Sequence, residues 1–215
     1  MRFPSLLMRL KEPTKVCKLC FKEINESTLS NIFNNYDVCS RCYEIIVPKF
    51  QTFKIDDIKA LAVYDYDERL QALIYQLKGC FDIEIAALFL ERFKRELRIR
   101  YFGYYVVPVP SYHEDDEIRE FNHVIEMFKS IKLTTLCLLE KTERFKQALN
   151  TQKQRKDVSK YLVLKEKPDL SKKKILLVDD VYTTGSTMKA AIELIKTLNP
   201  KKIEVLVVSK TIFKT

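Results

Sequence analysis

Short apolar runs alternate with amphipathic stretches along residues 49–215. The apolar runs predict buried strands at residues 58–66, 104–109, 135–139, 174–178 and 203–209. Between them, apolar positions at helical spacing predict helices at residues 67–79, 83–100, 117–130 and 186–197. Strands that alternate with helices in this way indicate an α/β fold with a mainly parallel sheet covered on both faces. Ligands bind at the carboxyl ends of the strands in such sheets, so we expect the site there.

The composition limits the size and the class of the protein. A chain of 215 residues has room for one α/β core and a small accessory module. With 47% hydrophobic and 31% charged residues, it is too apolar for a disordered chain and too evenly charged for a membrane protein. Charged residues interrupt the N-terminus too early for a signal peptide, and no apolar run approaches about 18 residues. We therefore expect a cytoplasmic protein without membrane insertion.

Four cysteines form two CxxC pairs within the first 48 residues. The pairs are Cys17 with Cys20 and Cys39 with Cys42. Two such pairs are typical of a tetrahedral site for Zn²⁺ in which four thiolates leave no open position, so the metal would be structural. Unligated core cysteines, a redox pair and an iron–sulfur cluster are the alternatives. With a boundary near Val47-Pro48, the domains are predicted as a zinc-binding module over 1–48 and a main domain over 49–215.

A strand end, two carboxylates and a hydroxyl-rich turn follow one another at residues 175–187. Asp179 and Asp180 end the apolar run, and vicinal ribose hydroxyls can donate hydrogen bonds to such carboxylates. The turn Thr-Thr-Gly-Ser-Thr then begins a predicted helix, whose N–H groups and hydroxyls can bind a phosphate. Gly185 would let the backbone approach the anion. The pattern predicts a ribose-phosphate site; the alternative is an ordinary strand–turn–helix with Ser/Thr caps, which needs only one such residue.

The segment 178–187 (VDDVYTTGST) resembles the motif by which type I phosphoribosyltransferases bind phosphoribosyl pyrophosphate (PRPP). Most of the chain is similar to the ComF family, which couples that domain to an N-terminal four-cysteine element. The likeness also involves residues 64–79, 108–110, 119–123 and 141–155.

This resemblance implies roles for individual residues. Asp179 and Asp180 would bind the ribose hydroxyls as the catalytic carboxylates, and Mg²⁺ would bridge pyrophosphate and ribose oxygens while leaning on ligand and water. The 5′-phosphate would lie on Thr183, Thr184, Gly185, Ser186 and Thr187, and further PRPP contacts would come from Arg119, Arg144 and Arg155.

One segment departs from the family pattern. Where several arginines are expected before Phe-Asn-Gln, residues 111–123 keep Arg119 but add four carboxylates at 114–117. We expect these carboxylates to lower the affinity for PRPP, unless they form only a solvated acidic loop. His113 and His123 have no nucleophile pattern around them and are predicted to be non-catalytic.

Residues 141–160 carry seven basic side chains against two acidic ones. We predict a partly helical segment that could hold a phosphate chain. A solvated helix face and a surface for single-stranded nucleic acid are the alternatives. The net charge of +9 attracts polyanions without selecting among them.

Three functions are compatible with these patterns. The first is a ComF-type protein that binds PRPP or a related ligand and acts in DNA uptake during natural competence. The second is an active phosphoribosyltransferase for a nucleobase or amine, although no acceptor-binding element is recognisable. The third is a non-catalytic adaptor that binds single-stranded DNA or recruits a helicase-like protein. Enzymatic activity is left undecided by the sequence.

Overall fold

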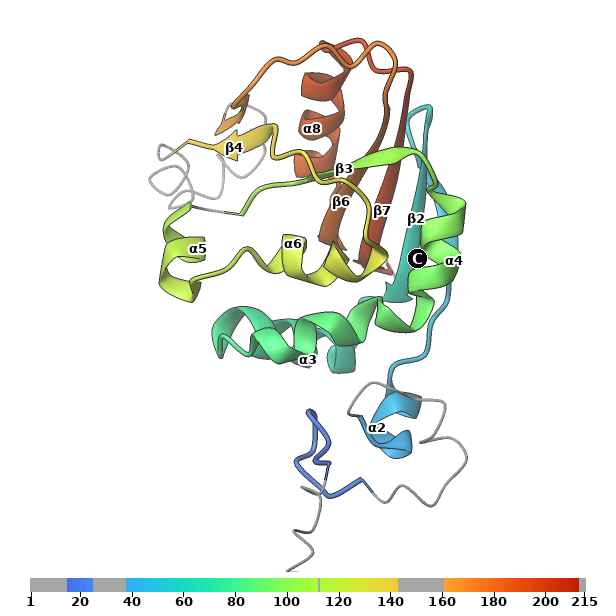
Figure 1. Cartoon of the computed structure of the whole chain (residues 1–215), viewed down its shortest axis with the longest axis vertical. Helices are drawn as coiled ribbons and strands as arrows, with labels where there is room; N and C mark the ends of the chain where they lie inside the picture. The colour runs from blue at the N-terminus through green and yellow to red at the C-terminus, as the bar shows by residue number, and fades with distance from the viewer. Residues whose placement is uncertain (1–14, 25–37, 112, 143–160, 213–215) are drawn as a thin grey trace, which may run out of the picture. The chain divides into compact units, whose positions relative to one another are not determined.

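The computed structural model describes residues 15–24, 38–111, 113–142 and 161–212, and the chain divides into two compact units, Met1–Ile45 and Ile46–Thr215 (Figure 1). In the first unit, an antiparallel bridge joins Val16 and Glu23, and helix α2 spans Ser40–Ile45. The assignment of this unit as a zinc-binding module stays a prediction. None of the helices in the described ranges is long and apolar enough to cross a membrane.

The second unit is built on a sheet with the strand order β1-β2-β7-β6-β3. Its strands are β1 (Gln51–Ile55), β2 (Ile58–Asp65), β3 (Tyr104–Pro108), β6 (Lys174–Tyr182) and β7 (Lys202–Lys210). β2, β7, β6 and β3 pair in parallel, and β1 joins β2 as an antiparallel edge. The predicted α/β fold with a mostly parallel sheet is confirmed.

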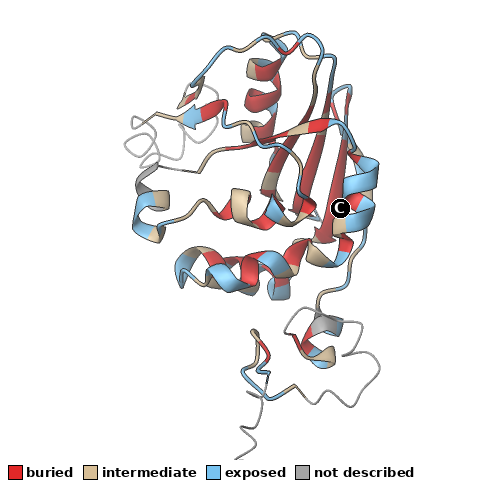
Figure 2. Ribbon diagram, in the orientation of Figure 1, coloured by how far each residue is buried: buried red, intermediate tan, exposed pale blue. Residues whose placement is uncertain are grey.

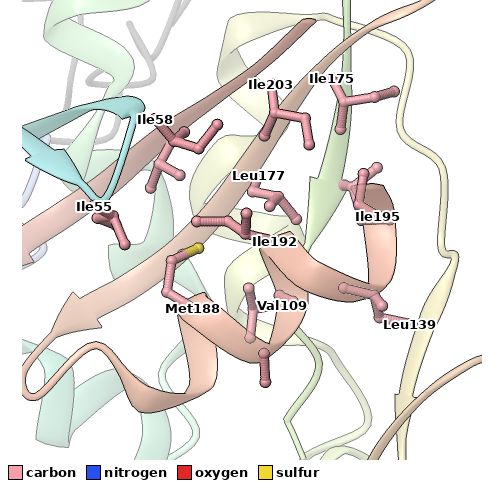
Figure 3. Close-up of a cluster of buried hydrophobic side chains, with 14 of the residues drawn as sticks. Ile55, Ile58, Val109, Leu139, Ile175, Leu177, Met188, Ile192, Ile195 and Ile203 are labelled. Carbon is pink, nitrogen blue, oxygen red and sulfur yellow. The ribbon is translucent and has the colours of Figure 1, made fainter. Parts of the chain in front are cut away.

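One face of this sheet packs against helix α8 (Ser186–Lys196). In Figure 3, Met188, Ile192 and Ile195 of the helix lie against Leu177 and Ile203 of the strands. A two-stranded antiparallel sheet, β4 (Leu139–Lys141) with β5 (Leu162–Leu164), adds its leucines to the same cluster. This core fixes α8 relative to β6, and the connection between these two elements carries the predicted phosphate loop.

The opposite face is also buried. Leu176, Val178 and Leu206 point away from α8, because side chains alternate along a strand, and none of them is exposed. Figure 2 shows these central strands as buried over most of their length. On this side, α6 (His123–Phe128) contacts β6, and α3 (Glu68–Gly79) and α6 both contact the 3₁₀ helix η1 (Ile83–Phe89). The continuous apolar strands therefore follow from burial on both faces.

The single helix predicted at residues 83–100 is wrong. The structure has η1, a second 3₁₀ turn η2 (Glu91–Phe93) and a short α4 (Lys94–Arg100). The Tyr64 hydroxyl donates a hydrogen bond of 2.8 Å to the carbonyl of Phe89, the group that an α-helix would offer to the Phe93 N–H. The N–H of Phe93 instead donates to Leu90. A tertiary hydrogen bond therefore accompanies the break.

The helix predicted at 117–130 is also divided. α5 (His113–Arg119) ends before Glu120, which has a φ of 64°. Asn122 then caps α6, since its Oδ1 accepts a hydrogen bond from the N–H of Ile125 at 2.9 Å. The 3₁₀ turn η3 (Lys129–Ile131) follows. The strand predicted at 135–139 is reduced to a bridge at Thr135, with β4 beginning at Leu139.

Candidate functional site

The connection from β6 to α8 forms a tight turn at the carboxyl end of the central strand. β6 ends at Tyr182, and Gly185 precedes α8 with a φ of 78°. The first helical hydrogen bond runs from the N–H of Lys189 to the carbonyl of Gly185, so the N–H groups of the preceding turn have no partner of this kind. Thr184 Oγ1 and Ser186 Oγ lie 3.1 Å apart at the start of the helix. Hydroxyls and N–H groups thus converge where the helix dipole favours an anion.

Gly185 is required here for two reasons. Its φ lies in the left-handed region, which costs free energy for any residue with a Cβ. In addition, a Cβ at this position would lie 2.3 Å from the Tyr182 hydroxyl oxygen and 2.6 Å from Cζ of the same ring. The turn between β6 and α8 therefore depends on this glycine for its backbone conformation as well as for open space.

A pocket of about 230 Å³ adjoins the turn. It is bounded by β6, α8, α3, α6 and the segment after β3. The side chains lining it include Lys78, Ser111, Arg119, His123, Lys141, Asp179, Asp180 and Thr187. The pocket thus combines two adjacent carboxylates with three cations, within one polar concavity at the carboxyl end of the parallel strands.

Asp180 is buried and engaged by two basic groups. Lys78, in the last turn of α3, forms an ion pair with its Oδ2, and His123 Nε2 lies 3.5 Å from the same oxygen. Its Oδ1 accepts a hydrogen bond from the N–H of Val181 at 2.8 Å. Burial raises the pKa of Asp180, but the hydrogen bond from His123 and the charge of Lys78 outweigh it and hold the pKa well below the usual range. Asp180 is therefore ionised at neutral pH.

The neighbours of His123 define its tautomer. Arg119 Nη1 lies 3.1 Å from His123 Nδ1, and since a guanidinium only donates, Nδ1 is the acceptor. The ring proton then sits on Nε2, which faces Asp180. Burial lowers the pKa of His123, which keeps the ring neutral despite the nearby carboxylate. His123 thus donates to Asp180 without a positive charge of its own.

Arg119 is held in turn by Asp116, whose Oδ1 lies 3.3 Å from Arg119 Nη1. The same carboxylate accepts hydrogen bonds from Ser111 Oγ at 2.5 Å and from Asn122 Nδ2 at 2.7 Å. Asp116 is therefore committed to positioning Arg119 at the pocket. The expectation that carboxylates 114–117 weaken PRPP binding stays a prediction, and the side chains of Glu114 and Asp115 lie outside the described residues.

Asp179 differs from its neighbour. It lines the pocket and is only partly buried, and its Oδ1 accepts a hydrogen bond from the N–H of Asp180 at 2.9 Å. No basic side chain forms an ion pair with it among the described residues. Burial and the negative charge of Asp180 raise the pKa of Asp179 well above its ordinary value of 3.8. The pair therefore shares charge unequally, with Asp180 ionised and Asp179 inclined to hold a proton.

The structure brings together some of the predicted site residues. Asp179, Asp180, Thr187 and Arg119 line one pocket, with Gly185 and Ser186 at the adjoining helix start. Thr183 and Thr184 are exposed in the turn. Arg144 and Arg155 lie outside the described residues. The roles of all these residues remain predictions.

Sequence reasoning missed the pocket roles of Lys78 and His123, whereas Lys141 belongs to the basic segment 141–160 that was expected to hold a phosphate chain. Lys78 belongs to the segment 64–79 that carries part of the family likeness, but its distance of about a hundred residues from Asp180 in the chain hides the contact. His123 was predicted to be non-catalytic because no nucleophile pattern surrounds it. Its position directly after Asn122, a residue type that caps helices, could have indicated a helix that begins at the site.

The four paired cysteines gather in the first unit. The Sγ atoms of Cys17, Cys20, Cys39 and Cys42 all lie within 4.8 Å of one another, and none forms a disulfide. Cys20 Sγ and Cys39 Sγ are 3.7 Å apart, close to the separation of about 3.8 Å that a tetrahedron with Zn–S bonds of about 2.3 Å requires. These four thiols could bind a metal ion and are consistent with structural zinc.

The backbone around these cysteines prepares them for that role. The N–H of Cys39 lies 3.3 Å from Cys17 Sγ. Although burial raises the pKa of Cys17, hydrogen bonds from backbone N–H groups, first that of Cys39, bring it down to about 7. Burial raises the pKa of Cys42. A thiolate on Cys17 thus begins to form near neutral pH, as metal binding needs.

Comparisons with known proteins agree with this picture. The family described as phosphoribosyl transferase domain matches residues 124–211, which contain β6, the turn, α8 and β7. Competence protein ComFC of Streptococcus pneumoniae (strain ATCC BAA-255 / R6) is 23% identical over 205 residues, which are 94% of this chain and 90% of that protein. These findings, with the four clustered cysteines, fit a ComF-like protein.

Solved structures that are similar to this chain include phosphoribosyltransferases. A hypoxanthine phosphoribosyltransferase from Staphylococcus aureus has a TM-score of 0.38 and 12% identity, covering 62% of this chain and 76% of its own. A purine phosphoribosyltransferase from Pyrococcus horikoshii Ot3 has a TM-score of 0.36 and 15% identity, covering 60% and 86%.

Proposed function

We propose that this protein binds PRPP or a related ribose phosphate in the pocket between β6 and α8. The observation that carries the proposal is the convergence of Asp179, Asp180 and Thr187 with Lys78 and Arg119 in one polar pocket. The matched family supports it, because the match includes the strand, turn and helix that form this pocket.

The parts of the ligand correspond to different groups of the site. The 5′-phosphate lies at the start of α8, where Thr183 to Thr187 offer hydroxyls and N–H groups at the positive end of the helix dipole. The ribose hydroxyls donate to Asp179, whose carboxylate is not held by a basic side chain. The pyrophosphate binds next to Arg119, Lys78 and Lys141, which supply the positive charge in the described part of the pocket. Arg144 and Arg155 are proposed to add to it.

Asp180 has a different task from Asp179. It is ionised and held by Lys78, His123 and the backbone, so it keeps Lys78 at the pocket and supplies a fixed negative charge. Mg²⁺ would be held mainly by pyrophosphate and ribose oxygens and by water. Asp179 is the protein carboxylate that would assist in holding it. The ion would neutralise the pyrophosphate charge.

We further propose a cytoplasmic role in DNA uptake, with single-stranded DNA and a helicase-like protein as partners. This step rests on the similarity to a protein named for competence and on the net charge of +9, which attracts polyanions.

Calorimetric titration with PRPP, with and without Mg²⁺, tests the ligand. We expect magnesium-dependent binding by the wild type and a loss of at least about tenfold in affinity for Asp179→Asn. The ligand and Mg²⁺ would favour the ionised form of Asp179, and one hydrogen bond to a charged group contributes about 1.5–3 kcal/mol. Glu166→Gln removes one negative charge at an exposed position away from the pocket and should bind like the wild type. A folded wild type that does not bind PRPP under either condition would refute the proposal.

A further inference from the structure

A second pocket lies at the other end of the sheet. Its volume is about 440 Å³, and it is lined by parts of β1, β2, β7 and the end of α4. Lys59 and Glu204 stand near the amino ends of their strands, whereas Asp179 and Asp180 stand near the carboxyl end of β6. The two pockets share no residue. This second cavity is therefore separate from the proposed PRPP site.

Like charges face each other in this pocket. Lys54 and Lys59 are directly opposite in the antiparallel register of β1 and β2, an arrangement that destabilises a hairpin. Arg100 contributes a third cation to the lining. Within the described ranges, neither lysine has an acidic partner. A bound anion would remove the repulsion between them.

The acidic residues of the hairpin do not neutralise these lysines. Asp56 and Asp57 form its turn, but they pair with Lys189 at 3.0 Å and Lys196 at 3.6 Å, both on α8. Figure 3 shows Ile55 and Ile58, which flank the turn, directed into the core beside α8. Because side chains alternate along a strand, Lys54 and Lys59 lie on the opposite face.

Among the described residues, Glu204 supplies the carboxylate that lines the cavity, and only one of its two oxygens has a partner. Its Oε1 accepts a hydrogen bond from the Tyr104 hydroxyl at 3.0 Å and forms an ion pair with Lys202 Nζ at 2.6 Å. Its Oε2 has no partner among the residues that the structure describes, although the side chain is only 14% exposed. These contacts and the charge of Lys202 lower the pKa of Glu204 against the effect of burial, so a free acceptor oxygen remains at neutral pH.

Most of the rest of the lining is apolar, with Thr52 as the polar exception. Tyr101 and Leu61 are buried to within 2% and form a rigid wall, and the Tyr101 ring is fixed edge-on against Tyr104 with centroids 5.7 Å apart. The volume falls in the range of about 300–1,000 Å³ that small-molecule sites occupy. Cations, an apolar wall and a hydrogen-bond acceptor thus define three kinds of contact in one cavity.

We propose that this pocket binds a small phosphorylated ligand of the nucleoside monophosphate class. Its phosphate lies on Lys54 and Lys59, its ring or sugar fills the cavity beside the apolar wall that Tyr101 and Leu61 support, and a hydroxyl or amino group donates to Glu204 Oε2. The ligand is a free molecule, distinct from the ribose phosphate of the β6–α8 pocket, and its binding does not depend on the proposed function of that pocket.

The probes are inorganic phosphate, adenosine monophosphate, guanosine monophosphate and an oligodeoxythymidine strand, each titrated calorimetrically into the full chain. We expect at least one monophosphate to bind more tightly than inorganic phosphate. The double variant Lys54→Ala, Lys59→Ala should lose at least about tenfold in affinity, because each charge-assisted hydrogen bond is worth that much. This variant removes a repulsion, so it should fold at least as well as the wild type.

Two controls locate the binding. Lys165→Ala, Lys172→Ala removes the same charge at exposed positions outside both pockets and should bind like the wild type. Asp179→Asn alters only the other pocket and should also retain monophosphate binding.

Three outcomes would overturn the proposal. The first is monophosphate binding that survives loss of Lys54 and Lys59 in protein that also carries Asp179→Asn, where the β6–α8 pocket is impaired. The second is no binding of either monophosphate at millimolar concentration. The third is lysine-dependent binding of the oligonucleotide alone, which would make the pocket a contact for a strand and not a site for a free ligand.

Discussion

At the scale of single residues, Asp179 and Asp180 show how one strand position separates two roles. Successive side chains of a strand point to opposite faces, so Asp180 turns toward α3 and α6 and meets Lys78 and His123. Asp179 turns to the other side and forms no ion pair among the described residues. The consequence is an ionised, immobilised carboxylate beside one whose ionisation is opposed by burial and by its neighbour.

This difference predicts a gain of stability from Asp179→Asn. The pKa of Asp179 is raised in the folded state, so its contribution is favourable below the unfolded value near 3.8 and is lost as pH rises through the folded pKa. The amide avoids that loss. The melting temperature of the variant should exceed that of the wild type at about pH 8, and the advantage should shrink toward about pH 4. An equal difference at both pH values would contradict the assignment.

The predicted site depended on chemistry that is local in the chain. Asp179, Asp180 and the turn to Thr187 are consecutive, so hydrogen-bonding capacity and helix-start geometry could be inferred from their order. Lys78 and His123 reach Asp180 only through the packing of α3 and α6 on the sheet. The sequence pattern of those helices does not indicate which strand end they face. Sequence reasoning therefore could not place Lys78 and His123 at the site.

At the scale of secondary structure, the elements with strong apolar periodicity were predicted closely. β2, α3, β6, α8 and β7 lie where the sequence placed them, although β6 extends to Tyr182. The edge strand β1 was missed, because only Phe53 and Ile55 of its five residues are apolar.

The two divided helices show a different limit. Their apolar spacing is helical and favours one continuous helix in each case, but a distant hydrogen bond accompanies one break and a local side-chain cap accompanies the other. The Tyr64 hydroxyl donates a hydrogen bond to the Phe89 carbonyl. The Asn122 side chain caps a new helix, α6, at the point where the predicted helix would have continued. Periodicity reports which face is buried and does not report such competing partners.

The start of α8 allows its backbone strain to be separated from steric clash. Gly185→Ala should cost about 1–2 kcal/mol for its positive φ, with a further loss because the new Cβ meets the Tyr182 ring. Gly103 provides the matched control, since it has a φ of 77° and no atom within 4 Å of an added Cβ. Urea unfolding should show a clearly smaller loss for Gly103→Ala, and equal losses would show that Tyr182 moves aside freely.

At the scale of the whole molecule, the two units differ in what holds them together. The second unit has a large apolar core on both faces of its sheet. In the first unit, the buried residues among those described are chiefly Cys17, Val38 and Cys42. Within residues 15–24 and 38–45, so few buried apolar side chains contribute little stability, so a metal bound by the four thiolates would supply the missing cross-links.

Removal of the metal should therefore affect one unit only. A strong chelator should increase hydrogen exchange at residues 15–24 and 38–45 while β6 and β7 stay protected. Purified wild-type protein should contain about one equivalent of zinc, Cys17→Ser should contain less, and Cys80→Ser, which changes an exposed cysteine outside the cluster, should match the wild type. Unchanged exchange after complete metal removal would exclude a structural role.

The pairing of β2 with β7 has a consequence for how the protein is made. Ala60 of β2 lies opposite Val205 of β7, so a strand translated early waits for one translated much later. At about 5–20 residues per second, the ribosome needs roughly 7–30 s to travel between them. Throughout that interval β1 is the only strand that can pair with β2. The other edge of this apolar strand is open to other nascent chains or to a chaperone. Slow codons between residues 66 and 201 should therefore lower the yield of soluble protein more than the same codons placed after residue 210.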